Sequence, residues 1–188
     1  MCDSDASAWV RRFAPLIRRG GRALDVAAGG GRHTRLLLRQ GLQVTAVDRN
    51  IEALQALAGP ACEVRRLDLE TGELGAVSEE LGRAYDAVVV TNYLHRPLFP
   101  VIAAALAPGG LLLYETFAIG NERFGRPSNP DFLLRPGELL SAFAGLAVIA
   151  FEQGAVAHPR PAVIQRLAAI NGPLGALESD AAGGVQPS

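Results

Sequence analysis

The stretch Arg22-Ala-Leu-Asp-Val-Ala-Ala-Gly-Gly-Gly-Arg-His-Thr34 decides the fold of this 188-residue chain. It predicts a short buried strand that runs into consecutive glycines and then into a helix. Glycine at such a turn permits positive φ and lets a ligand approach the backbone. The free N–H groups and the positive dipole end of the helix N-terminus add polar contacts. The stretch therefore predicts an α/β fold with a ligand-binding loop.

Asp48 gives that loop a partner, because it ends the next apolar run, Gln43–Val47. In such a fold an acidic residue at this position can hold both hydroxyls of a ribose. A glycine triplet alone is often only a tight turn, but together with Asp48 it predicts nucleoside binding. A dinucleotide fingerprint fits less well, because Thr34 stands where its third Gly or Ala is expected. Asp25, just before the loop, would repel a pyrophosphate but could hold an ammonium group.

Short apolar runs and helix-like stretches alternate along the rest of the chain. Their order predicts an α/β, Rossmann-like doubly wound sheet of seven strands, mostly parallel. The connection Gln153–Pro161 is too short for a helical crossover, so the last strand is expected to be antiparallel. The expected strands are Ala23–Ala27, Gln43–Val47, Glu63–Leu67, Ala87–Thr91, Leu111–Glu115, Ala147–Phe151 and Ala162–Leu167. The expected helices are Thr34–Gln40, Ile51–Leu57, Leu98–Leu106 and Gly137–Phe143. A break in regular secondary structure is expected at Ala107–Gly110.

The pattern predicts a single domain over residues 1–172. Residues 1–20 would hold an N-terminal helix, and residues 118–134 would form a lid-like insertion or a covering Ω-loop. Residues 173–188 are rich in Gly, Ala, Ser and Pro without a period, which is typical of a disordered tail.

Composition excludes several kinds of chemistry. All 18 basic residues are arginine, so a Schiff-base lysine and a P-loop are impossible. Cys2 and Cys62 form neither a disulfide framework nor a CxxC site, and the three histidines lack the spacing of a metal site. A net charge of −1 argues against a broad nucleic-acid footprint. No run suits a signal peptide or a membrane helix, so we expect no membrane partner, a cytoplasmic location, and a monomer or homodimer.

Five motifs in order over about residues 20 to 170 resemble those of the class I S-adenosylmethionine-dependent methyltransferases. They are Asp25–Gly31, Asp48, Arg65–Glu70, Tyr85–Leu94 and Leu106–Glu115. Ala27 replaces the first glycine of the loop motif, a departure that we expect to be mild. Within the superfamily the likeness is closest to small tellurite-resistance and related small-molecule methyltransferases, because of Gly31-Arg-His33, Val44–Arg49 and the compact length.

This resemblance implies S-adenosyl-L-methionine as cofactor, S-adenosyl-L-homocysteine as product, and a small-molecule methyl acceptor. The implied cofactor-binding residues are Asp25, Ala27, Ala28, Gly29, Gly31, His33, Asp48, Arg49, Asp68, Leu69, Asn92 and Tyr93, with no metal ligands. Two alternatives stay open: a tRNA or rRNA methyltransferase that uses Arg11, Arg12, Arg18, Arg19, Arg65 and Arg66, and a nucleoside-binding module without catalysis. An N/D-P-P-Y/F motif is missing after the fourth strand, which disfavours amide or adenine acceptors.

Tyr93, His95 and Arg96 follow the fourth strand and are the candidate catalytic residues. His95 is either a general base or the cap of the helix that starts at Pro97. Tyr93 lines the methyl channel or simply packs, and Arg96 recognises an anionic acceptor or is a solvated loop residue.

Residues outside this strand end receive weaker assignments. His33 is expected to be a hydrogen bonder at a helix start, His158 an exposed loop residue, and Trp9 a core residue rather than a cofactor cap. In the lid-like insertion the candidate pocket residues are Asn121, Arg123, Phe124, Arg126 and Asn129.

Overall fold

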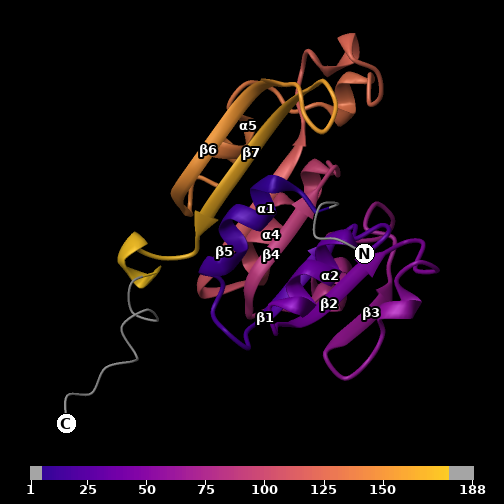
Figure 1. The fold of residues 1–188 in the computed structure, drawn as a ribbon, viewed down its shortest axis with the longest axis vertical. Helices are drawn as coiled ribbons and strands as arrows, with labels where there is room; N and C mark the ends of the chain where they lie inside the picture. Colours follow the sequence, from indigo (N-terminus) through magenta and orange to yellow (C-terminus); the bar gives the residue numbers. More distant parts are fainter. Residues whose placement is uncertain (1–5, 178–188) are drawn as a thin grey trace.

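A seven-stranded sheet forms the centre of the computed structural model, which describes residues 6–177 (Figure 1). The strand order is β3-β2-β1-β4-β5-β7-β6, and all neighbours are parallel except β7, which is antiparallel to both β5 and β6. The predicted fold class and the antiparallel last strand are confirmed. The strands are β1 (Arg22–Val26), β2 (Gln43–Asp48), β3 (Cys62–Arg66), β4 (Tyr85–Thr91), β5 (Leu106–Phe117), β6 (Ala147–Val156) and β7 (Ala162–Ile170).

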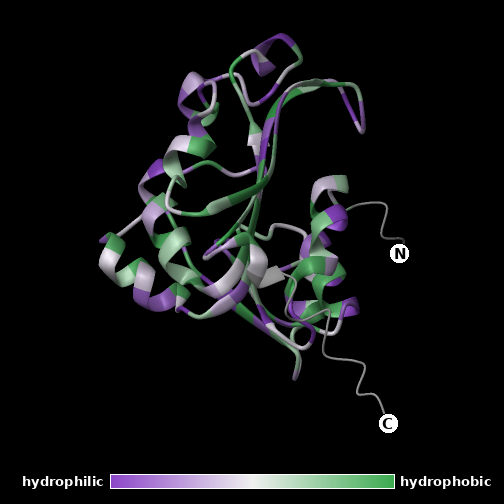
Figure 2. Cartoon of the chain, turned by 90° about the vertical axis from the view of Figure 1, so that its left-hand side faces the viewer, coloured by the Kyte–Doolittle hydropathy of each residue, from purple (hydrophilic) through white to green (hydrophobic). Residues whose placement is uncertain are grey.

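Alternate residues of each strand point to opposite faces of the sheet, and both faces are buried along β1, β2, β4, β5 and β7 but not along the edge strands β3 and β6. On β4, Ala87 and Val89 join a core cluster with α1 and α2, whereas Val88 and Val90 join the larger cluster with α3, α4 and α5. Hydrophobic residues accordingly follow the strands through the middle of the molecule (Figure 2). The helices are α1 (Ala8–Phe13), α2 (Arg32–Arg39), α3 (Leu74–Leu81), α4 (Phe99–Ala105) and α5 (Glu138–Ala142).

The helix expected at Ile51–Leu57 is wrong. This segment contains turns and a single 3-10 turn, Gln55–Leu57. Leu54 is fully buried and packs with Ala28 and Ala46, so its apolar pattern reflects local packing under the loop rather than a helix face. The sequence analysis also missed α3, whose buried face consists of Val77 and Leu81.

The break expected at Ala107–Gly110 is wrong as well, because β5 continues through it as a bulge. The register with β4 jumps from the pair Tyr85 and Leu106 to the pair Ala87 and Leu111. A Cβ on Gly110 would lie 2.6 Å from the Tyr85 carbonyl oxygen, so this crossing needs glycine. At the other end of the chain, Leu174–Leu177 form a 3-10 turn, and the rest of the predicted tail lies outside the described residues.

β1 and β4 lie next to each other, although their helical connections run to opposite faces. Ligands of doubly wound sheets bind outside the carboxyl ends of the strands at such a switch point. The glycine loop follows β1 and the Asn92–Arg96 segment follows β4, so the fold places both at this edge.

Candidate functional site

The glycine loop is fixed by its backbone conformation and by Asp48. Gly31 has a φ of 74°, and a Cβ there would lie 2.7 Å from Leu57 Cδ1 and 2.9 Å from Leu54 Cδ2. The Gly29 N–H donates to Asp48 Oδ2 at 2.7 Å, and the Asn50 N–H donates to Asp48 Oδ1 at 2.9 Å. Each carboxylate oxygen keeps a second lone pair, so Asp48 can hold the loop and still accept ribose hydroxyls.

The replacement of glycine by Ala27 in the loop is less mild than expected. Its φ is 53°, in the left-handed region that glycine tolerates and alanine rarely adopts. The added methyl group therefore strains the first turn of the loop.

A cavity of about 170 Å³ opens beside the loop, and we call it the donor cavity. Its wall has more negative than positive charge, with Asp48, Asp68 and Glu70 against Arg49. Among the described residues, Tyr93 Oη is a buried side-chain oxygen without a hydrogen-bond partner, and Tyr93 lines this cavity. Burial, with Glu70 nearby, raises the pKa of Tyr93, so its hydroxyl stays protonated. The lining residues are Ala27, Asp48, Arg49, Leu67, Asp68, Leu69, Glu70 and Tyr93.

A second cavity, of about 630 Å³, begins at Asn92, the residue before Tyr93 at the same strand end, and we call it the acceptor cavity. Asn92 lines it, whereas Tyr93 lines the donor cavity. Asn92 has a φ of 55°, and this left-handed step separates the two neighbouring side chains. The lining residues are Ala6, Ser7, Ala8, Arg11, Arg32, Asn92, Glu115, Phe117, Val156, His158, Pro159, Arg160, Ala162, Ile164 and Arg166.

Five predicted cofactor residues line neither cavity: Ala28, Gly29 and Gly31 in the loop itself, and the buried Asp25 and His33. Asp25 is buried, and its Oδ2 accepts a 2.6 Å hydrogen bond from the Thr34 hydroxyl. Burial raises the pKa of Asp25 to about 6, although the bonds from Thr34 work against the shift. The structure thus places Asp25 where it supports the start of α2, and not where it meets a ligand directly.

His33 joins the N-terminal segment to the sheet. Its Nε2 accepts from the Ser7 N–H at 3.1 Å, which leaves Nδ1 to carry the proton toward Thr91 Oγ1, also at 3.1 Å. Burial, with a contribution from Arg32, lowers the pKa of His33 to about 3. A neutral imidazole in this position matches the expected hydrogen bonder at a helix start.

Of the candidate catalytic residues, only Tyr93 lines a cavity described above. His95 is half-buried and occupies the N-cap position of the 3-10 turn Arg96–Leu98, but its side chain makes no capping hydrogen bond. The capping alternative for His95 is therefore wrong. Its role as a base stays a prediction.

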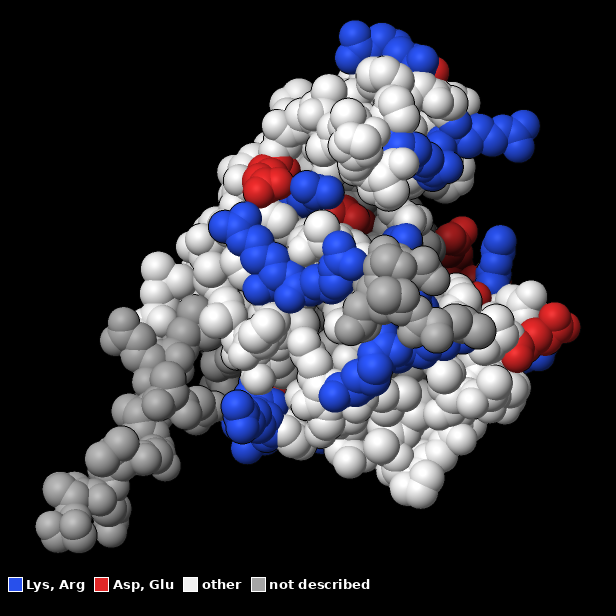
Figure 3. All heavy atoms as spheres, in the orientation of Figure 1, with Lys and Arg blue, Asp and Glu red and all other residues white. Residues whose placement is uncertain are grey.

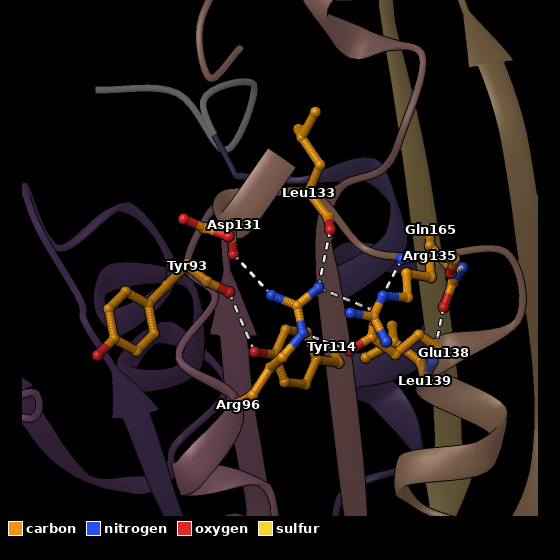
Figure 4. A network of polar contacts seen from close by, with 9 residues as sticks. All are labelled: Tyr93, Arg96, Tyr114, Asp131, Leu133, Arg135, Glu138, Leu139 and Gln165. Atoms are coloured by element: carbon orange, nitrogen blue, oxygen red, sulfur yellow. Dashed lines mark hydrogen bonds and ion pairs between the residues drawn. The ribbon is translucent and has the colours of Figure 1, made fainter. Parts of the chain in front are cut away.

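Arg96 does not point to an acceptor, because four of its five guanidinium N–H groups bond inside the protein (Figure 4). Nε donates to Glu138 Oε1 at 2.6 Å, Nη1 to the Asp131 carbonyl at 2.6 Å, and Nη2 to the Leu133 carbonyl at 2.9 Å. Burial alone would raise the pKa of Glu138, but the bonds from Arg96 and from the Arg135 N–H lower it below its usual range. Arg96 thus ties the end of the segment 118–134 to α5.

The segment 118–134 is anchored at both ends. Ala118 pairs with Leu134, and Asn121 is buried and accepts from the Val163 N–H at 3.2 Å. None of the pocket residues expected in this segment, Asn121, Arg123, Phe124, Arg126 and Asn129, lines the donor or the acceptor cavity.

The sequence analysis missed Leu67 and Glu70 in the donor cavity, although both flank the predicted Asp68. It also missed Arg32, Arg160 and Arg166 in the acceptor cavity. Nothing in an all-arginine composition distinguishes these three from the others. Within residues 6–177 no group of His, Cys, Asp and Glu side chains could hold a metal ion.

Comparison with known proteins interprets this pair of cavities. Residues 3–126, which span the glycine loop, Asp48 and the strand end at Asn92, match the family described as the methyltransferase domain. The chain belongs to this family of class I S-adenosylmethionine-dependent methyltransferases.

The chain is 31% identical over 150 residues to a ubiquinone biosynthesis O-methyltransferase from Caulobacter sp. (strain K31). The match covers 67% of this chain and 58% of that protein, so the chain spans little more than half the length of its curated relative.

Solved structures share the fold of this chain at low sequence identity. TehB from Haemophilus influenzae superimposes with a TM-score of 0.70 at 16% identity, covering 88% of this chain and 62% of that one. The 1,6-didemethyltoxoflavin-N1-methyltransferase from Burkholderia thailandensis gives a TM-score of 0.64 at 19% identity, covering 90% and 81%. The likeness to tellurite-resistance methyltransferases is therefore borne out for the fold. In the described part of the chain, no helix has the length and hydropathy to span a membrane.

Proposed function

We propose that this chain transfers the methyl group of S-adenosyl-L-methionine to a small molecule bound in the acceptor cavity. The observation that carries the proposal is the strand end at Asn92 and Tyr93, where consecutive residues line the two cavities. Donor and acceptor sites that meet at one backbone step can hold two reactants in line.

The donor cavity fits this cofactor by charge and by hydrogen bonding. Its surplus of carboxylates suits a cationic ligand, and the unpartnered Tyr93 Oη is free to bond to one. Asp48 would hold the ribose, while Asp68 and Leu69 would hold the adenine edge, as the family resemblance implies. When bound, S-adenosylmethionine would supply an electrophilic methyl carbon on its cationic sulfur: the acceptor nucleophile would bond to that carbon as the C–S bond breaks, and S-adenosylhomocysteine would leave with the electron pair.

The protein's part in this reaction is mainly positioning. Asp48 ties the loop to β2, and the buried Asp25 and Thr34 fix the start of α2. A soft or anionic nucleophile needs no general base. The predicted role of His95 as a base is tested with His95→Ala, since unchanged turnover of a confirmed acceptor would eliminate it.

Calorimetric titration with S-adenosylmethionine and S-adenosylhomocysteine tests the donor site. Both should bind, and Asp48→Ala should weaken binding at least tenfold, because bonds to a charged group are lost. Glu79→Ala, an exposed acid on α3, is the matched control and should leave affinity unchanged. If neither ligand binds the wild-type protein, the proposal fails.

Turnover distinguishes the remaining alternatives. Release of S-adenosylhomocysteine with a panel of thiols, amines, phenols and carboxylates would establish catalysis, and binding without any turnover would favour the non-catalytic module. The RNA alternative finds less support, because Arg12, Arg18 and Arg65 are ion-paired with Glu152, Asp86 and Glu63. A strongly salt-dependent affinity for tRNA or rRNA would favour it nevertheless.

A further inference from the structure

The acceptor cavity is basic, unlike the donor cavity. Among residues 6–177, four arginines, Arg11, Arg32, Arg160 and Arg166, line it together with one carboxylate, Glu115. Basic side chains also gather on the face of the molecule where α1 lies (Figure 3). A ligand in this cavity therefore meets a surplus of positive charge.

The arginines of the cavity differ in whether a carboxylate of the protein already neutralises their charge. Arg166 donates to Glu115 at 2.5 Å and to Glu152 at 3.1 Å, so its charge is balanced within the protein. Arg32 and Arg160 form no ion pair with any residue in the described range 6–177. Arg160 instead lies over the Phe117 ring, with its guanidinium carbon 5.7 Å from the ring centroid. These two guanidinium groups remain available to an anion.

One wall of the same cavity is apolar. Phe117, Ala162 and Ile164 form a small buried cluster at the end of β5 and on β7, joined by the partly buried Val156. With a volume of about 630 Å³, the cavity is in the range of sites for organic ligands, well beyond a bare inorganic anion. An apolar wall beside two unpaired arginines suits an amphipathic anion.

We propose that the acceptor is an organic anion, a carboxylate or phosphate monoester with an apolar body, held by Arg32 and Arg160 against the Phe117 wall. This inference rests on the proposed function. Arg32 opens α2 directly after the glycine loop, and Arg160 lies on the connection between β6 and β7. Both residues line the cavity, so they can orient the anionic end while the apolar body lies along β7.

Calorimetry in the presence of saturating S-adenosylhomocysteine tests the assignment. The probes are 3-phenylpropionate and phenyl phosphate, each compared with the uncharged 3-phenylpropionamide. We expect the anions to bind about tenfold more tightly than the amide, because charge-assisted hydrogen bonds to arginine are lost in the amide. Arg160→Gln and Arg32→Gln should each weaken anion binding several-fold and leave amide binding unchanged.

Arg83→Gln is the matched control, since this exposed arginine lies just before β4, at the opposite end of the strands. It should leave every probe unchanged. Equal affinity for anions and amide, or unaltered anion affinity in both variants, would overturn the inference while S-adenosylhomocysteine still binds. If Arg32→Gln weakens S-adenosylhomocysteine and not the anions, Arg32 serves the donor's own carboxylate, and its assignment to the acceptor is wrong. Failure of S-adenosylhomocysteine itself to bind would count against the proposed function instead.

Discussion

Ala27 and Gly29 adopt nearly the same backbone conformation, with φ of 53° and 54°. Both positions are left-handed, but only Ala27 carries a methyl group there. A left-handed conformation costs an L-residue about 1–2 kcal/mol, partly offset because glycine loses more entropy on folding. The pair therefore separates backbone strain from packing within one loop.

Ala27→Gly should raise the free energy of unfolding by about 0.5–1 kcal/mol. Gly29→Ala is the reverse experiment, and it should lower that free energy by about 0.5–1 kcal/mol, because a Cβ there meets no atom within 4 Å and only the strain, net of the entropy term, acts. Urea denaturation of both variants measures the effect. A loss of stability in Ala27→Gly would show that the alanine methyl group contributes packing that outweighs its strain.

His33 should make stability depend on pH. Its pKa is lowered from 6.5 to about 3 in the folded protein, so between these values the unfolded chain binds a proton that the folded chain does not. Stability from this group therefore falls as pH drops below 6.5, by about 1.4 kcal/mol per unit. His33→Gln should be less stable at pH 7 and lack this component.

The measurement is urea denaturation of wild type and His33→Gln between pH 7 and 4.5. The difference between the two isolates His33, because Asp25 acts in the opposite direction from pH 3.8 to about 6 in both proteins. A difference that stays constant with pH would mean that His33 binds its proton as readily in the folded state as in the unfolded chain, so that folding does not lower its pKa.

At the scale of elements, the segment 118–134 depends on one side chain of a neighbouring segment. Arg96 bonds two of its carbonyl groups, at Asp131 and Leu133, and pairs with Glu138 on α5. The lid function predicted for this segment remains a proposal. Its exposed Ile119, Phe124 and Phe132 are the apolar side chains that a closing motion would bury.

Arg96→Gln should destabilise the fold by about 1–3 kcal/mol, because it removes the donor of two carbonyls and the cationic partner of Glu138. Hydrogen exchange should rise between residues 118 and 134 and stay unchanged in β1 and β4. Arg126→Gln, an exposed position in the same segment, is the control and should change neither quantity. Uniform loss of protection across the sheet would contradict a local role for Arg96.

Elements were predictable where the apolar period is clear and not where short helices form. Each strand was expected within a few residues of its observed position, because strands buried on both faces are nearly continuous apolar runs. The turns at 51–57 and the helix Leu74–Leu81 were misassigned, because a few apolar residues there serve local packing and show no full helical period.

At the scale of the whole molecule, α1 anchors the N-terminal segment to β7, a strand far away in the chain. Trp9 is buried, stacks edge-to-face on Phe13 at 4.6 Å, and donates from Nε1 to the Leu167 carbonyl at 3.3 Å. This confirms Trp9 as a core residue.

Trp9→Ala should lower the free energy of unfolding by about 3–5 kcal/mol. Circular dichroism should follow the unfolding, since Trp9 is the only tryptophan of the chain. Leu16→Ala removes a side chain that is 44% exposed on the same N-terminal segment, and it should cost less than about 1 kcal/mol. Unchanged stability with lost S-adenosylhomocysteine binding would instead support the cofactor-cap alternative.

The sequence by itself determined where the strands occur along the chain, the glycine loop, and the acids Asp48 and Asp68, because these depend on local patterns of apolar and turn residues. Only the tertiary structure decided what each side chain meets. In the folded chain Asp25 and His33 are buried beneath the loop, and Arg96 bonds to the segment 118–134. Arg32 and Arg160 line one cavity. Those two residues lie far apart in the chain, and they line one cavity because the sheet places the start of α2 and the β6–β7 connection at the same edge, where β1 and β5 end.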